Sequence, residues 1–232
     1  MPRAPRFRIP GYPVHVIQRG NNRGACFMRD ADRILYLALL GELSRSEHCP
    51  VHAYVLMTNH VHLLVTPEER ESLSELMRKL GQRYVQHFNR VHKRTGGLWE
   101  GRFRSCLVDS QTYFLRCHRY IELNPLRAAM VRRPSEYPWS SYLTNALGES
   151  SSLIEPHRTY LELGRDPAQR RTAYRQLFKA NLTNAELSEI RAAANSGFAL
   201  GSKAFITELE RVSGRRPVRA PRGREAAIEI CP

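Results

Sequence analysis

Apolar and polar residues recur along the first half of the chain with the periods of strands and helices. Short apolar or alternating runs predict four strands, at residues 14–19, 51–57, 60–66 and, with a glycine break, 98–108. Apolar stripes predict helices over 31–48 and 71–92, and a third that starts near Asp109 or Ser110 and ends near Leu123. The order β-α-β-β-α-β-α predicts an α+β sandwich with helices packed on an antiparallel-rich sheet.

The two long predicted helices each have one apolar face. In the first helix we expect the core-facing residues to be Ile34, Leu35, Ala38, Leu39 and Leu43. In the second helix we expect Leu73, Leu76, Met77, Leu80, Tyr84 and Phe88 to face inward. The opposite face of the second helix is basic.

The composition changes near residue 145, where a polar, Gly/Ser-containing linker is followed only by helical patterns. Asp166-Pro167, the capping box that starts at Thr183, and Ser202 mark three helix starts. Arginines then dominate 211–224, which contains no acidic residue. We therefore expect a domain at 1–149 and a helical, arginine-rich appendage at 150–232 with a flexible basic end.

Charge narrows the choice of partner. The net charge is +14 and the pI is about 10.1, with arginine as the main basic residue. A polyanion is the expected partner, because the planar guanidinium donates two hydrogen bonds to a phosphate. We therefore favour nucleic acid over a basic surface without a partner.

Other features favour the cytoplasm. No apolar run approaches the roughly 18 residues of a membrane span, and the basic N-terminus lacks the apolar segment of a secretory signal. The five cysteines are an odd number without a C-x-x-C pair. We expect buried free thiols and a reducing compartment, with no disulfide framework and no cysteine zinc site.

Candidate chemistry is concentrated in two short segments. His60 and His62 lie two apart in a predicted strand and therefore point to one face. Tyr120 and Asn124 lie four apart in a predicted helix and also share a face. Two imidazoles and an amide oxygen suit an open site for a divalent metal, and a phenol can attack a phosphate.

Each of these residues also has a purely structural interpretation. A histidine pair on a strand is often a pair of satisfied polar side chains, although burying two unpartnered imidazoles is costly. Tyr120 could be a core aromatic, and Asn124 could cap the end of its helix. Tyr113 lies on the same helical face as Tyr120, but no asparagine follows it four residues later.

The set His60, His62, Tyr120 and Asn124 resembles the HUH single-strand endonucleases with one catalytic tyrosine. The likeness is closest to the REP-associated tyrosine transposases of the IS200/IS605-like group. It is carried by the segments 57–65 (MTNHVHLLV), 98–105 (LWEGRFRS) and 120–127 (YIELNPLR), and by 138–141 and 199–202. Many insertion-sequence relatives have glutamine at the position of Asn124, whereas asparagine matches the REP-associated branch.

This resemblance implies a ferredoxin-like HUH fold and an activity. His60, His62 and Asn124 would hold Mg²⁺ or Mn²⁺, and Tyr120 would be the nucleophile. The substrate would be single-stranded DNA with a REP-like palindromic hairpin, cut and rejoined through a 5′-phosphotyrosine. The protein would be a monomer or a homodimer and would associate with the nucleoid.

For DNA contacts we expect arginines on phosphates and an aromatic under an unpaired base. The candidates are Arg19, Asn21, Asn22, Arg23, Trp99, Arg102, Arg104, Arg215 and Arg216. Trp99 could instead belong to the core. The last helices could read duplex DNA in the manner of a helix-turn-helix or serve only as a cap.

Two rival functions follow from the same residues. One is a hairpin-binding regulator that retains the fold without catalysis. The other is a hydrolase of small phosphate esters, which the net charge of +14 disfavours, because a small substrate does not need so wide a basic surface.

Overall fold

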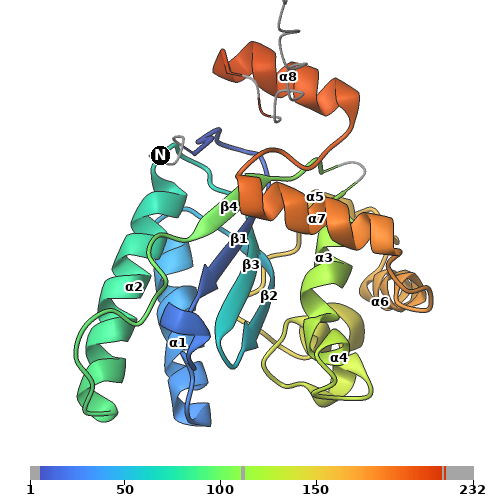
Figure 1. The fold of residues 1–232 in the computed structure, drawn as a ribbon. Helices are drawn as coiled ribbons and strands as arrows, with labels where there is room; N and C mark the ends of the chain where they lie inside the picture. The colour runs from blue at the N-terminus through green and yellow to red at the C-terminus, as the bar shows by residue number, and fades with distance from the viewer. Residues whose placement is uncertain (1–5, 111–112, 216, 218–232) are drawn as a thin grey trace, which may run out of the picture.

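A sheet lies at the centre of the computed structural model, which describes residues 6–110, 113–215 and 217. Among these residues the sheet has four antiparallel strands in the order β2-β3-β1-β4. They are β1 (Val14–Arg19), β2 (Val51–Met57), β3 (His60–Val65) and β4 (Arg104–Leu107). The predicted ferredoxin-like α+β sandwich is confirmed (Figure 1).

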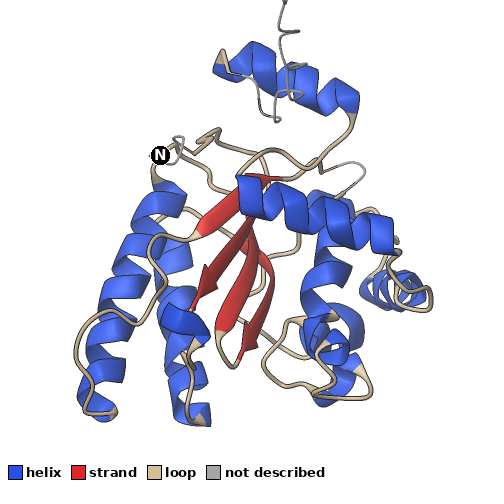
Figure 2. Cartoon of the chain, viewed as in Figure 1, coloured by secondary structure: helices blue, strands red, loops and turns tan. Residues whose placement is uncertain are grey.

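Helices cover both faces of the sheet (Figure 2). One face packs against α1 (Asp30–Ser46) and α2 (Ser72–Val91), and the other against α3 (Phe114–Glu122) and α7 (Asn184–Ser196). The remaining α-helices are α4 (Asn124–Arg127), α5 (Arg158–Leu161), α6 (Pro167–Leu177) and α8 (Lys203–Ser213). Short 3₁₀ or π turns are η1 (Asn21–Arg23), η2 (Pro134–Glu136) and η3 (Leu143–Leu147).

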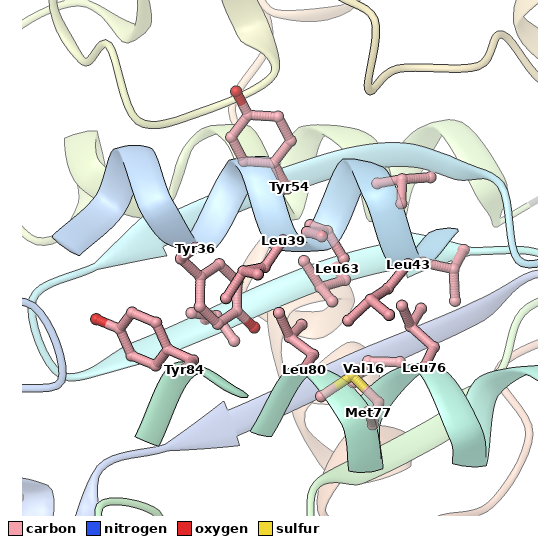
Figure 3. Packing of buried hydrophobic residues seen from close by; sticks show 14 of the residues in the cluster. Val16, Tyr36, Leu39, Leu43, Tyr54, Leu63, Leu76, Met77, Leu80 and Tyr84 are labelled. Carbon is pink, nitrogen blue, oxygen red and sulfur yellow. The ribbon is translucent and has the colours of Figure 1, made fainter. Parts of the chain in front are cut away.

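The first core lies between the sheet and the helices α1 and α2 (Figure 3). The apolar face of α2 is as predicted, with Leu76, Leu80 and Tyr84 fully buried. The prediction for α1 is partly wrong, because Ile34 is 60% exposed and Ala38 is exposed as well. The residues of α1 that pack inward are Tyr36, Leu39, Leu40 and Leu43.

A buried contact between Asp32 and His92 explains the orientation of α1. The Asp32 carboxylate accepts hydrogen bonds from the backbone N–H of Met28 and Arg29 and lies 3.0 Å from His92 Nε2. Asp32 therefore faces inward at the start of the helix. Residues four and seven positions later share its face, whereas Ile34 points outward.

The second core lies on the opposite face of the sheet and includes residues from the end of the chain. Phe114 and Ile121 of α3 share it with Ile190 and Ala194 of α7. Leu209 of α8 belongs to the first core. The predicted boundary near residue 149 stays a prediction. After it, α7 packs on β4 and β1, whereas α6 packs against α5 and η3.

The region between α2 and α3 departs from the predicted pattern. Only residues 104–107 of the predicted strand 98–108 form β4, because Gly101 has a φ of +72° and interrupts the extended backbone. The third helix begins at Phe114 rather than near Asp109 or Ser110. The Asp109 carboxylate instead accepts hydrogen bonds from the backbone N–H and the hydroxyl of Ser202, at the start of α8.

Two further expectations concern the cysteines and membranes. The four cysteines among the described residues, Cys26, Cys49, Cys106 and Cys117, are all free and buried, as predicted. In the part of the chain that the structure describes, no helix is both long and apolar enough to span a bilayer.

A buried carboxylate anchors α3. Glu122 has no exposed surface. Its Oε1 accepts hydrogen bonds from Ser141 Oγ at 2.6 Å and Asn145 Nδ2 at 2.9 Å, and its Oε2 accepts one from the Tyr174 hydroxyl at 2.8 Å. Burial raises the pKa of Glu122 to about 7, against the opposing effect of these three hydrogen bonds.

The raised pKa predicts that the protein loses stability as the pH increases. The folded state retains a proton that the unfolded state releases above about pH 4.5, so the free energy of unfolding falls between about pH 4.5 and 7. The fall should amount to at most roughly 3 kcal/mol. Glu122→Gln should remove this component, since its amide can accept from Ser141 and donate to Tyr174. Denaturant titrations at several pH values check the prediction, and parallel profiles for the two proteins would contradict it.

Candidate active site

The four residues singled out from the sequence lie around one pocket. His60, His62, Tyr120 and Asn124 all line a cavity of about 280 Å³. β3 is an inner strand, and its alternation turns both histidines toward the side covered by α3. As predicted, the two histidines of the strand and the pair Tyr120 and Asn124 come together at one place in the structure.

His60 is held from behind by the turn that precedes it. Its Nδ1 lies 2.7 Å from Asn59 Oδ1, and Asn59 Nδ2 donates to the carbonyl of Arg23 at 3.0 Å. Because that amide oxygen can only accept, His60 carries its proton on Nδ1 and leaves Nε2 bare. Burial and the nearby Arg19 lower the pKa of His60 to about 4, so the ring is neutral at pH 7.

His62 is neutral for the same physical reason. Its ring lies 5.1 Å from that of His60, at an interplanar angle of 79°. Burial lowers the pKa of His62 well below its ordinary value, with smaller contributions from His15, His60, Arg127 and Arg19. Neutral imidazoles have a lone pair available, which is the form that binds a metal.

Tyr120 reaches the histidines from α3 with the edge of its ring. The ring centroids of Tyr120 and His62 are 5.7 Å apart, at 79°. The Arg127 guanidinium lies over the phenol ring, 4.5 Å from its centroid, and donates to the Tyr120 carbonyl at 2.6 Å. The side chain and backbone of Tyr120 are thus both held by one arginine, and Tyr120 is only 6% exposed.

Asn124 fits both of the interpretations left open by the sequence. Its Nδ2 donates to the carbonyls of Tyr120 at 3.0 Å and Ile121 at 3.3 Å, which is a helix-terminal contact. Since only the amide nitrogen can donate, the geometry assigns Oδ1 to the other side of the amide. That oxygen remains available as a ligand in the pocket.

The donor set fits a divalent cation of intermediate hardness. His60 Nε2, His62 Nε2 and Asn124 Oδ1 would supply two nitrogens and one oxygen and leave further positions open. Mn²⁺ tolerates imidazole better than Mg²⁺, which prefers oxygen. Among the described residues no group of three or more His, Cys, Asp and Glu side chains is placed to hold a metal. A cation on His60 and His62 would therefore take the Asn124 oxygen as a further protein ligand.

Arginines surround the pocket. Arg19, Arg102 and Arg104 line it, and their contacts with DNA phosphates stay a prediction. Besides Ile17 and Glu100, two lining residues of α7 were missed in the sequence, Arg191 and Asn195, and Arg104 donates to Asn195 Oδ1 at 2.5 Å. Arg191 and Asn195 are four apart on a predicted helix, so the sequence could show that they share a face. Only the packing of α7 on the sheet brings that face to the pocket.

The other predicted DNA contacts lie outside the pocket. Asn21, Asn22 and Arg23 form the exposed turn η1. Trp99 is partly buried against Tyr36 and Tyr84, with ring centroids 6.4 and 6.1 Å away. Its role as a stacking platform stays a prediction.

The end of the chain is described only in part. Arg215 lies over the ring of Phe7, with its guanidinium 4.7 Å from the centroid. Arg216 and the basic segment from 218 lie outside the described residues.

The sequence places the chain in a transposase family. A family model described as "Transposase IS200 like" matches residues 9–124, and the chain belongs to this family. The match contains all four predicted site residues, and it ends at Asn124. Arg191 and Asn195 lie beyond it.

A solved structure supports the fold. A REP-associated tyrosine transposase, solved bound to a REP hairpin, superposes with a TM-score of 0.55 and 17% sequence identity, covering 68% of this chain and 93% of that one. A candidate transposase from Deinococcus radiodurans is 18% identical, with a TM-score of 0.37, over 52% of this chain and 95% of that one. No curated protein sequence matches the chain. The predicted resemblance is confirmed at the level of family and fold.

The contacts of Arg127 predict a structural cost for its removal. Arg127→Met keeps the aliphatic length but loses the charge over the ring and the hydrogen bond to the Tyr120 carbonyl. We expect the variant to be less stable by roughly 1–3 kcal/mol, measured by chemical denaturation. Arg133→Met is the matched control, because that side chain is 81% exposed and should change stability by less than about 0.5 kcal/mol. Equal effects in the two variants would contradict this account of Arg127.

Proposed function

We propose that the protein is a metal-dependent endonuclease and strand transferase that acts on single-stranded DNA at palindromic hairpins through a covalent 5′-phosphotyrosine. The observation that carries the proposal is the meeting of two neutral histidines, an amide oxygen and Tyr120 in one arginine-lined pocket. The family of the chain supports a transposase role. The hairpin substrate is proposed because the REP-associated transposase of similar fold was solved with a REP hairpin.

The proposed reaction is a reversible transfer of a phosphodiester bond. The Tyr120 oxygen would attack the phosphorus, its proton would pass to solvent, and the bond from phosphorus to the 3′ oxygen would break. The 3′ oxygen would take up a proton and leave as a free 3′-OH. The phosphotyrosine retains the energy of the broken bond, so the reverse attack by a 3′-OH can rejoin strands without ATP.

Each part of the pocket has a distinct task in this reaction. A divalent cation bound there would withdraw charge from the non-bridging phosphate oxygen. Arg127 holds the Tyr120 ring and thereby limits the directions from which the phenol can attack. Arg19, Arg102, Arg104 and Arg191 line the pocket and would contact the flanking phosphates.

A non-catalytic hairpin-binding protein is the second candidate. The observation that favours it is the low exposure of Tyr120, since a phenol that is 6% exposed must gain access to a phosphate before it can attack. The two candidates share the DNA-binding surface and differ only in the covalent step.

The covalent step is the direct test of the proposed function. End-labelled single-stranded hairpins from the genomic neighbourhood of the gene are incubated with the protein and Mn²⁺ and separated on denaturing gels. We expect a protein-linked label with the wild type and none with Tyr120→Phe, which should still bind the hairpin. Tyr113→Phe, at the residue that precedes α3, is the control and should form the adduct. Cleavage by Tyr120→Phe would reject the nucleophile, and binding without any adduct in the wild type would favour the non-catalytic candidate.

The position of Arg191 predicts a role for α7 in binding DNA. If Arg191 contacts a phosphate, Arg191→Ala should weaken hairpin binding and reduce the slope of log K against log salt by about 1. Arg132→Ala removes an exposed arginine outside the pocket and is the matched control. Binding curves at several salt concentrations measure both slopes. An unchanged slope for Arg191→Ala would exclude α7 from the DNA interface.

A further inference from the structure

A third histidine lies behind the pocket. His15 of β1 is 0% exposed and does not line the cavity. In the pairing of β1 with β3, Ile17 is directly opposite His62, and His15 is the next residue of β1 on the same face. This diagonal position lets the His15 ring reach the His62 ring, and the distance from His15 Nε2 to His62 Nδ1 is 2.9 Å.

The contacts of His15 are few for a buried polar side chain. Its ring meets the edge of Tyr120, with centroids 5.7 Å apart. Its Nδ1 has no hydrogen-bond partner among the described residues. An apolar side chain of similar size would avoid the cost of burying this nitrogen. The hydrogen bond to His62 is therefore the property that distinguishes His15 from a valine or leucine at this position.

The direction of this hydrogen bond decides whether His62 can bind a metal. Both rings are buried, and at 2.9 Å the two facing nitrogens share one proton. If His15 donates, His62 must carry its own proton on Nε2, and that nitrogen has no lone pair for a cation. If His62 Nδ1 donates, His62 Nε2 is bare and can act as a ligand.

His60 shows the same arrangement with a different partner. Its Nδ1–H is taken by Asn59 Oδ1, so that its Nε2 is the bare nitrogen. Each histidine of the pair thus has a side-chain partner behind Nδ1, on a strand for His62 and in a turn for His60.

We propose that His15 is a positioning residue, which accepts the Nδ1–H of His62, fixes its tautomer and thereby raises the affinity of the pocket for a divalent cation. The inference rests on the metal site of the proposed function. It adds a residue that touches neither the metal nor the pocket.

The test measures Mn²⁺ binding to the DNA-free protein by electron paramagnetic resonance. His15→Leu fills the space without an acceptor and should weaken Mn²⁺ binding by about 10- to 100-fold. His15→Gln places an amide oxygen near the position of Nε2 and should restore affinity to within about threefold of the wild type. Thermal unfolding of both variants checks that they fold. Equal weakening in both variants would overturn the acceptor role.

A spectroscopic readout tests the tautomer directly in the wild-type protein. The ¹⁵N shifts of the imidazole nitrogens distinguish a protonated Nδ1 from a protonated Nε2, in the absence of Mn²⁺. We expect His62 to carry its proton on Nδ1, and a proton on Nε2 would overturn the inference.

His60→Ala separates the failure of the inference from that of the proposed function. If His60→Ala weakens Mn²⁺ binding and His15→Leu does not, only the role of His15 is rejected. If neither the wild type nor any variant binds Mn²⁺ in this pocket, the metal site is rejected together with the inference. Adduct formation on hairpins then shows whether Tyr120 acts as the nucleophile without that metal site.

Discussion

The pairing of β1 with β3 is the constraint on which the rest of the molecule depends. Val16 and Leu63 on these strands face the core beneath α1 and α2, and the alternate residues face α3. A slip of one residue would turn the histidines into the apolar core and valines toward the pocket. The hydrophobic core therefore fixes the register, and the register places His62 beside His15.

The position of the nucleophile depends on a second polar anchor. α3 is buried on most of its circumference, so it could rotate only by breaking contacts on several sides. Glu122 holds one side through Ser141, Asn145 and Tyr174, while Tyr120 points toward the sheet. A carboxylate without solvent is an expensive anchor, but its three donors specify a single orientation of the helix.

The sequence predicted the parts of this arrangement that depend on local periodicity. Period two placed His60 and His62 on one face, and period 3.6 did the same for Tyr120 and Asn124. His15 was missed because its contact is diagonal across two strands, which no spacing within one strand reveals. Arg191 was missed because it reaches the pocket only through the packing of α7. Ile34 was misplaced because a buried Asp32–His92 pair, rather than the apolar stripe, sets the phase of α1.

The positive charges around the pocket add to the effect of burial, which lowers the pKa values of His60 and His62. Arg19 contributes to the lowered pKa values of both His60 and His62, and Arg127 contributes to that of His62. A cationic rim attracts phosphate, and the same field opposes protonation of the imidazoles at its centre. The arrangement thus keeps the lone pairs of the histidines free in the DNA-free protein. A rim of lysines would supply similar charge, but arginine adds the bidentate geometry that suits a phosphodiester. The arginines therefore both oppose protonation of the histidines and suit phosphate binding.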